Sequence, residues 1–328
     1  MRHLHHRAGL LFAVAALTAA AAIASQDAPS TLAEPSTPAA NQGAQPAPLP
    51  LLWKVSDDDN AVYLLGSFHL LKPTDYPVSD DVEDALAAAG KVVFEVTPEE
   101  LRDPANTPKF MEAAGYGDAR TLSGVLPAEM LAQLAVLLAP KGITVSQLES
   151  FEPWFVNLTL VMGLAQSEGF SPEQGLDQHL MTRAAAAGKP IAGLESMEAQ
   201  LAALESSPMP EQLKSLADFL DRSEEMPQML ADLHQAWREA DAEQLEALAA
   251  AEMRDNTPMT YKAVVVDRNN AWTPQLQAML DGADTSDTLV VVGALHLVGE
   301  DSVVEKLRVR GYTVERICSA CEAGSAAR

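Results

Sequence analysis

A chain of 328 residues with 48% hydrophobic and 21% charged residues has globular composition and enough length for one large α/β domain or two small ones. Its formal net charge of -24 repels phosphate backbones, and with 5% aromatic residues it lacks a basic, aromatic platform for single strands. These values exclude a wholly disordered protein and argue against a nucleic-acid partner.

The first 24 residues have the pattern of a cleaved secretory signal. Residues 1–7 carry positive charge, residues 8–23 form an Ala-rich apolar run, and small residues stand at positions 22 and 24. The run is shorter than the roughly 20 residues of a spanning helix, which disfavours a membrane anchor. We therefore expect cleavage after Ala24 and a periplasmic or secreted protein with no stable membrane anchor.

Residues 25–50 are rich in Ala, Pro, Ser, Thr, Gln and Asn and contain almost no large apolar side chain. Such a segment buries too little surface to offset the entropy lost on ordering, so we expect a disordered tether. Residues 51–317 are predicted to form a single α/β domain, and residues 318–328 a C-terminal tail.

The domain is predicted to start with a β-hairpin. Two apolar runs, residues 51–55 and 61–65, flank the sequence Ser-Asp-Asp-Asp-Asn, whose side chains favour a turn. A helix follows from Ser79, as its N-cap, to Gly90 in the C′ position. Residues 91–96 then have the apolar pattern of a buried strand.

The chain from about residue 98 to residue 280 is predicted to be a large helical insertion. Apolar residues recur at spacings of three and four in residues 129–138, 153–164 and 212–220. One α/β step lies within it, with a helix over residues 177–187, a Gly-Lys-Pro turn, and a short strand over residues 191–194.

The chain returns to the sheet near its end. Residues 287–293 form an apolar strand, a helix from residue 299 or 300 reaches Arg310, and residues 312–317 form the last strand. The predicted fold is therefore α/β, with a central mixed β-sheet built from both ends of the chain and a large helical insertion.

Two of the predicted strands are followed by one motif: a glycine, two residues and a histidine. Gly66 and His69 begin and end the first copy, and Gly293 and His296 the second. Random placement of 18 glycines and 7 histidines gives about 0.4 matches, whereas two are present, both after strands. Ligands of open α/β sheets bind beyond the carboxyl ends of the strands, so both histidines are candidate ligands.

Glu95 lies at the end of a third apolar strand. A carboxylate there faces solvent, pairs with a cation such as Lys91 or Lys72, or binds a metal ion. Two neutral imidazoles and a carboxylate, with one position left for water, can hold a divalent ion and lower the pKa of its water. The sequence thus predicts a Zn²⁺, Mn²⁺ or Co²⁺ site formed by His69, His296 and Glu95.

These features together resemble the TraB/GumN family. The resemblance covers about residues 51–317 and is carried by the two Gly-x-x-His segments, Glu95, Gly175-Leu-Asp177, residues 188–196 and Asp267-Arg-Asn269. The family is related to Tiki metalloproteases and, more remotely, to erythromycin esterases. The resemblance implies an α/β fold with a helical insertion and metal-dependent hydrolysis at the paired motifs and the glutamate. It also favours manganese or cobalt.

Three further residues, Asp177, Glu195 and Arg268, are candidate catalytic groups. Asp177 and Glu195 each lie at a predicted helix start, where capping is the competing explanation. Arg268 can present a fixed cation to a substrate carboxylate or a tetrahedral oxyanion, or can form a salt bridge on a helix surface. His179 and His234 lack the motif and are expected to be surface or core residues.

Cys318 and Cys321 are the two cysteines of the chain and follow the last predicted strand. In an exported protein they are expected to form a local disulfide. A thioredoxin-like dithiol is disfavoured because such motifs open a helix early in a βαβ unit.

The favoured function is an exported metal-dependent hydrolase whose metal-bound water attacks the carbonyl of a peptide or a small ester or amide. A non-catalytic periplasmic binding or regulatory protein with the same cleft is one alternative. An envelope assembly protein, suggested by the helical insertion and the tether, is another. The sequence has no nucleophile elbow, His-Glu-x-x-His helix, Walker A loop or dinucleotide fingerprint, which weakens serine-hydrolase and nucleotide-binding hypotheses.

Overall fold

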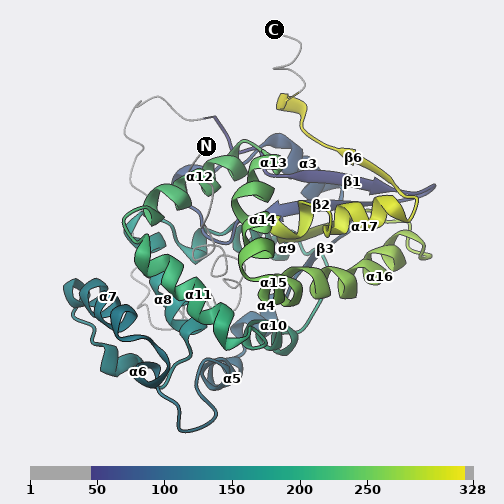
Figure 1. Ribbon diagram of the computed structural model, residues 1–328. Helices are drawn as coiled ribbons and strands as arrows, with labels where there is room; N and C mark the ends of the chain where they lie inside the picture. The colour runs from purple at the N-terminus through teal and green to yellow at the C-terminus, as the bar shows by residue number, and fades with distance from the viewer. Residues whose placement is uncertain (1–45, 322–328) are drawn as a thin grey trace.

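A computed structural model describes residues 46–321. Its centre is a six-stranded sheet of order β4-β3-β5-β2-β1-β6 (Figure 1). The strands are β1 Leu52–Ser56, β2 Ala61–Ser67, β3 Lys91–Phe94, β4 Ile191–Gly193, β5 Thr288–Gly293 and β6 Thr313–Arg316. Strands β2 to β5 are parallel, whereas β1 pairs antiparallel with both β2 and β6. The predicted mixed sheet, built from both ends of the chain, is confirmed.

The predicted signal and most of the predicted tether lie outside the described residues. Residues 46–50, which the tether was expected to include, are instead held against the domain. The Leu49 N–H donates to the carbonyl of Arg238 at 2.7 Å, and Pro50 is buried. The expected boundary at Pro50 is therefore corrected, because these residues have packing and hydrogen-bond partners that local composition does not reveal.

The predicted helical insertion lies between β3 and β5 and includes β4. In Figure 1 its helices α5 to α8 and α11 gather to the left of the sheet. The helices of the insertion are α4 Pro98–Arg102, α5 Asn106–Ala113, α6 Leu122–Val125, α7 Ala128–Leu138, α8 Pro153–Ser167, α9 Leu176–Ala186, α10 Met197–Glu205, α11 Met209–Asp221, α12 Met226–Arg238, α13 Ala242–Leu245, α14 Ala251–Asn256, α15 Pro258–Tyr261 and α16 Arg268–Leu280. Helix α3 Asp80–Ala88 precedes β3, and α17 Val303–Val309 follows β5.

Strand β5 joins the two halves of the sheet, because it pairs with β2 on one side and β3 on the other. All six of its residues are buried, as expected for a central parallel strand. Ser67 at the end of β2 lies opposite Gly293 at the end of β5. The carboxyl ends of these strands therefore meet at one edge of the sheet, where both Gly-x-x-His motifs begin.

Of two predicted helix boundaries, the first is confirmed and the second is wrong in detail. Gly90 occupies the C′ position, directly after the C-cap Ala89, but its backbone is not left-handed. An added Cβ would lie 2.9 Å from the Cβ of Ser286, which accounts for the glycine. Helix α17 starts later than expected, since Gly299 has φ +79° and the Ser302 side chain caps the helix instead.

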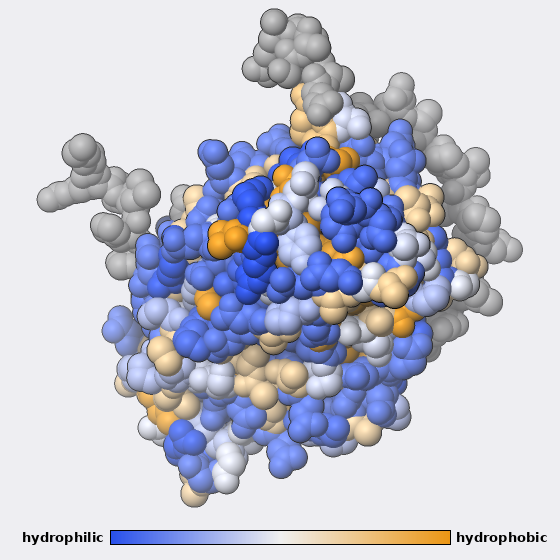
Figure 2. All heavy atoms as spheres, turned by 90° about the vertical axis from the view of Figure 1, so that its right-hand side faces the viewer, coloured by the Kyte–Doolittle hydropathy of each residue, from blue (hydrophilic) through white to orange (hydrophobic). Residues whose placement is uncertain are grey.

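The surface of the molecule is largely polar on the face shown in Figure 2, where apolar residues are scattered among hydrophilic ones. Within residues 46–321, none of the helices combines the length and the hydropathy that crossing a bilayer requires.

Cys318 and Cys321 lie at disulfide-bonding distance with Cα atoms 5.3 Å apart, in agreement with the predicted local bridge.

Candidate functional site

The candidate residues converge at the carboxyl edge of the parallel strands. His69 follows β2, Glu95 follows β3, Glu195 follows β4 and His296 follows β5. Arg268, the first residue of α16, reaches the same place from the helical insertion. The structure thus brings these predicted residues together although 227 positions separate the two histidines in the chain.

Glu95 lies between the two imidazole rings. Its Oε1 is 3.9 Å from His69 Nε2 and 4.0 Å from His296 Nε2. The same oxygen accepts the Gly293 N–H at 2.7 Å, which fixes the carboxylate against the end of β5. Glu95 and both histidines are 5% exposed or less, so these contacts form in the core.

Asp177 and Ser67 orient the ring of His69. The Asp177 Oδ1 lies 3.2 Å from His69 Nδ1 and accepts the Ser67 hydroxyl at 2.9 Å. Because a carboxylate oxygen can only accept, His69 donates from Nδ1, and its Nε2 is the ring nitrogen nearer to Glu95. This contact, and not helix capping, accounts for Asp177.

Asn269 orients the ring of His296 in the same way. His296 Nδ1 lies 2.7 Å from the Asn269 side-chain oxygen, and the Asn269 amide nitrogen donates to the Asp301 carbonyl at 2.9 Å. The second bond fixes which end of the amide faces the ring, so His296 also donates from Nδ1. Its Nε2 accepts from Arg268 Nη1 at 3.2 Å.

Arg268 is the central cation of the site. Its Nη2 donates to Glu95 Oε2 and to Glu195 Oε1, both at 2.6 Å. Its Nε donates to Glu195 and its Nη1 to the carbonyl of Val264 and to His296, so all five N–H groups have acceptors. The surface salt bridge considered for Arg268 is thereby excluded, and Glu95 pairs with this guanidinium and not with Lys91 or Lys72.

The helix that carries Arg268 is locally widened, because a π-helical segment, η6 Lys262–Asp267, immediately precedes α16. Such segments occur often at functional sites. Further along α16, the indole N–H of Trp272 donates to Glu195 Oε2 at 3.1 Å, and its ring lies against both Arg268 and His296. Ser196 caps α10, so Glu195 is free of the capping role considered for it.

Four residues that complete this network have no role predicted from the sequence: Ser67, Gln200, Asn269 and Trp272. Gln200 is buried, and its amide donates to Glu95 Oε2 at 3.1 Å and to Glu195 Oε1 at 3.4 Å. Ser67 lies inside the first motif and Asn269 beside Arg268, so their positions were signals that could have been used. Gln200 sits in an ordinary amphipathic helix and had none.

Burial and neighbouring charges shift the pKa values of His69, His296, Glu95 and Glu195. Burial lowers the pKa of His69, but the charge and hydrogen bond of Asp177, with the charge of Glu95, raise it to a net value above normal. Burial and the Arg268 cation lower the pKa of His296 to about 3. Burial raises the pKa of Glu95, yet Arg268 and the histidines bring it down to about 2. The pKa of Glu195 is raised, chiefly by burial.

The donor set fits a divalent cation chemically. The site holds three carboxylates and one guanidinium: Glu95 and Glu195 pair with Arg268, and Asp177 pairs with His69. Two negative charges are therefore uncompensated within this group when the histidines are neutral. The raised pKa of His69 has the same origin, since the site stabilises one more positive charge there. Nitrogen and oxygen donors with fixed outer partners are typical of Zn²⁺, Mn²⁺ and Co²⁺ centres.

The spacing of these donors is wider than in a metal's coordination shell. Among residues 46–321, no group of three or more His, Cys, Asp or Glu side chains is arranged to hold an ion as it stands. Donor atoms on one ion lie about 3 to 3.5 Å apart, against the 3.9 and 4.0 Å here. Binding therefore requires a small closure around Glu95 Oε1 and the exchange of the Arg268 contact at His296 Nε2.

A protein-family model described as the TraB/PrgY/gumN family matches residues 51–316, which include the whole sheet. The chain belongs to the TraB/PrgY/gumN family. Uncharacterized protein YbaP of Escherichia coli (strain K12) is 26% identical over 247 residues, which cover 75% of this chain and 87% of that protein. The protein of the same name from Shigella flexneri matches to the same extent. The resemblance stated from the motifs is confirmed, and both histidines of this TraB/PrgY/gumN chain lie within the match.

Gly175, which precedes Asp177, packs directly on the backbone of His69. An added Cβ would lie 2.4 Å from the His69 carbonyl oxygen. We expect Gly175→Ala to lower the free energy of unfolding by about 3 kcal/mol, measured by urea denaturation. In Gly117→Ala the Cβ would meet nothing within 4 Å, so this control should change the value by less than about 1 kcal/mol. Equal effects of the two changes would contradict the contact.

His296 should make the metal-free protein sensitive to acid. Its folded-state pKa of about 3 lies below the usual 6.5, so between these values the unfolded chain binds a proton that the folded chain does not. Stability then falls as pH falls, by about 1.4 kcal/mol per pH unit for one proton. We expect His296→Gln to flatten the dependence between pH 6 and pH 4 by about this slope in urea denaturation. An unchanged slope would show that His296 is protonated in the fold.

Proposed function

We propose that this chain is an exported metal-dependent hydrolase in which His69, His296 and Glu95 hold a divalent ion. One observation carries the proposal: both imidazoles are fixed through Nδ1, so that both Nε2 atoms face the same oxygen of Glu95. An arrangement that served packing alone would not need two separate acceptors, Asp177 and Asn269, to impose this orientation. Zn²⁺, Mn²⁺ and Co²⁺ all suit the nitrogen and oxygen donors.

A divalent ion held there would polarise a carbonyl group and lower the pKa of water, which is the chemistry of peptide and ester hydrolysis. The protein's own part is to keep the donors in place and in the correct protonation state. Asp177 and Asn269 fix the tautomers of the two rings. Arg268 keeps Glu95 ionised, as its low pKa indicates, so that the carboxylate is available as a ligand.

Arg268 also has a direct role in this proposal. Its Nη1–H toward His296 Nε2 is the donor that loses its acceptor when that nitrogen binds another partner. Glu195 and Glu95 continue to hold the guanidinium in place through Nε and Nη2. A preorganised N–H beside the reacting group can then stabilise the oxyanion of a tetrahedral state. Glu195 thus acts as a positioning residue for Arg268.

The substrate class is a peptide or a small ester or amide, as expected from the family resemblance. Metal binding without hydrolysis of any such probe would favour a non-catalytic binding or regulatory protein with the same cleft. If changing both histidines altered neither metal binding nor function, an assembly role would be favoured.

Metal analysis tests the site directly. Untagged protein, stripped with a chelator and titrated with Zn²⁺, Mn²⁺ or Co²⁺ in a calorimeter, should bind one equivalent. We expect His69→Ala and His296→Ala to weaken binding more than about 100-fold and to abolish hydrolysis of p-nitrophenyl acetate, and Asn269→Ala to weaken binding about 10- to 100-fold. His179→Ala, a histidine stacked on Tyr76, is the matched control and should bind normally. Equal metal content and activity in all variants would refute the site.

Metal affinity should also depend on pH through His69. The pKa of this imidazole is raised, and a ligand must be neutral, so affinity should fall tenfold per pH unit below that pKa. His296 is already neutral above pH 3 and should release no proton. Calorimetry in buffers of different ionisation enthalpy should therefore detect about one proton released at pH 6. Asp177→Asn should move this release to lower pH, and release of no proton in the wild type would contradict the assignment.

A further inference from the structure

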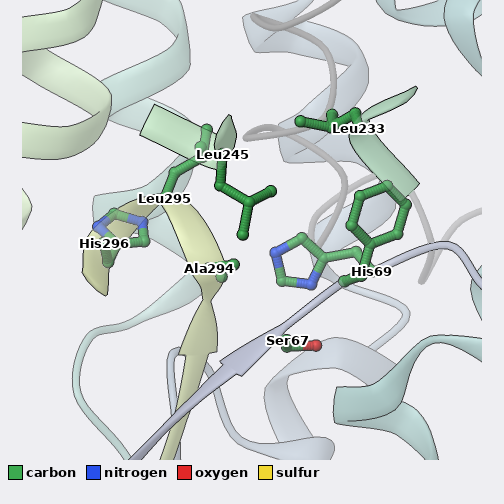
Figure 3. A pocket seen from close by; sticks show the side chains of 9 residues that line it. Ser67, His69, Leu233, Leu245, Ala294, Leu295 and His296 are labelled. Atoms are coloured by element: carbon green, nitrogen blue, oxygen red, sulfur yellow. The ribbon is translucent and has the colours of Figure 1, made fainter. Parts of the chain in front are cut away.

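An apolar cavity lies against the two imidazole rings (Figure 3). Nine residues line it, and apart from His69, His296 and Ser67 they are a glycine and five apolar residues: Phe68, Leu233, Leu245, Ala294 and Leu295. No aspartate, glutamate, lysine or arginine contributes to this lining. A group that enters the cavity therefore meets the candidate ligands on one side and hydrocarbon on the others.

The helical insertion forms one wall of the cavity. Leu233 comes from α12 and Leu245 from the end of α13, whereas Ala294 and Leu295 belong to the turn after β5. In Figure 3, Leu233 and Leu245 lie above the His69 ring and Ser67 lies below it. A π-helical segment, η5 Glu246–Ala250, directly follows Leu245 and packs against the turn after β5. The insertion thus sets the size of the space beside the histidines.

The volume of the cavity limits what it can hold. It measures about 30 Å³, room for about two water molecules or for a group of two to three heavy atoms. A charged group there would lose its hydration without a partner other than the histidines, which is costly. A long alkyl chain or an aromatic ring is larger than this volume, and the buried side chains of Leu233 and Leu245 form its wall.

We propose that this cavity is a subsite for a short aliphatic group, of methyl or ethyl size, bonded to the carbonyl carbon that is attacked. This inference rests on the proposed hydrolase function and deepens it. The favoured substrates are acetyl and propionyl esters or amides, and peptides with a small residue on the acyl side. Water breaks the acyl bond and gives the short acid and the alcohol or amine.

The proposal assigns the limit on chain length to Leu245. Leu245→Ala removes three carbon atoms from the wall and should admit longer acyl groups. Leu230 is the matched control: it is a fully buried leucine of α12 that does not line the cavity. Leu230→Ala should therefore reproduce the general effect of a lost core leucine without changing the preferred chain length.

Hydrolysis of p-nitrophenyl acetate, butyrate and hexanoate by the Co²⁺-loaded protein measures this preference. We expect kcat/KM for acetate to exceed that for hexanoate by about 50-fold in the wild type and in Leu230→Ala, and by less than about 5-fold in Leu245→Ala. A wild-type ratio near one, or an unchanged ratio in Leu245→Ala, would overturn the subsite while leaving the hydrolase proposal intact.

Binding of aceto-, butano- and hexanohydroxamate, followed by calorimetry, gives a readout independent of turnover. Tighter binding of the shorter hydroxamates by the wild type, with this preference reversed or flattened in Leu245→Ala, supports the subsite. If the hydroxamates bind in this order but none of the esters is cleaved, the proposed hydrolysis alone fails. Equal affinities for the three hydroxamates would overturn the subsite. Failure of all three to bind would overturn both the metal centre and the subsite.

Discussion

The site depends on a network of two ion pairs that share the Arg268 guanidinium, one with Glu95 and one with Glu195. Removing ions from water is costly, and the cost is offset here because every N–H of the guanidinium has an acceptor. This network also connects three elements, because its residues come from α16 and from the ends of β3 and β4. Loss of Arg268 would leave both carboxylates without their cation, and loss of either carboxylate would leave guanidinium N–H groups without acceptors.

The two histidines are alike in motif but not in electrostatic surroundings. His69 lies beside Asp177 and is drawn toward the protonated form, whereas His296 accepts from Arg268 and is held neutral. In the metal-free protein, the surroundings therefore favour protonation of His69 and oppose protonation of His296. Binding of a divalent ion would replace that proton without a second ionisation event, which keeps the charge change in the core small.

The fold, and the convergence of the principal candidate residues at one sheet edge, could be predicted because their signals are local. Apolar runs followed by Gly-x-x-His identified His69 and His296, and a carboxylate at the end of an apolar strand identified Glu95. The role of Asp177 could not be decided, since an acidic residue in a first helical turn has the same local pattern whether it caps the helix or bonds to a distant imidazole. Gln200 was missed because its role exists only through tertiary contacts with Glu95 and Glu195.

The central position of β5 has a consequence for how the chain acquires this structure. The hairpin β1–β2 and the pair β3–β4 share no backbone pairing until Thr288–Gly293 enters between them. Contacts of such long sequence separation form late, because the loop-closure entropy must be lost first. During synthesis, the nascent chain would carry two unpaired inner strand edges until residues 288–293 are made. Such edges can form non-native pairs. A partner that shields them would therefore benefit this protein more than it would benefit a protein whose sheet is assembled in chain order.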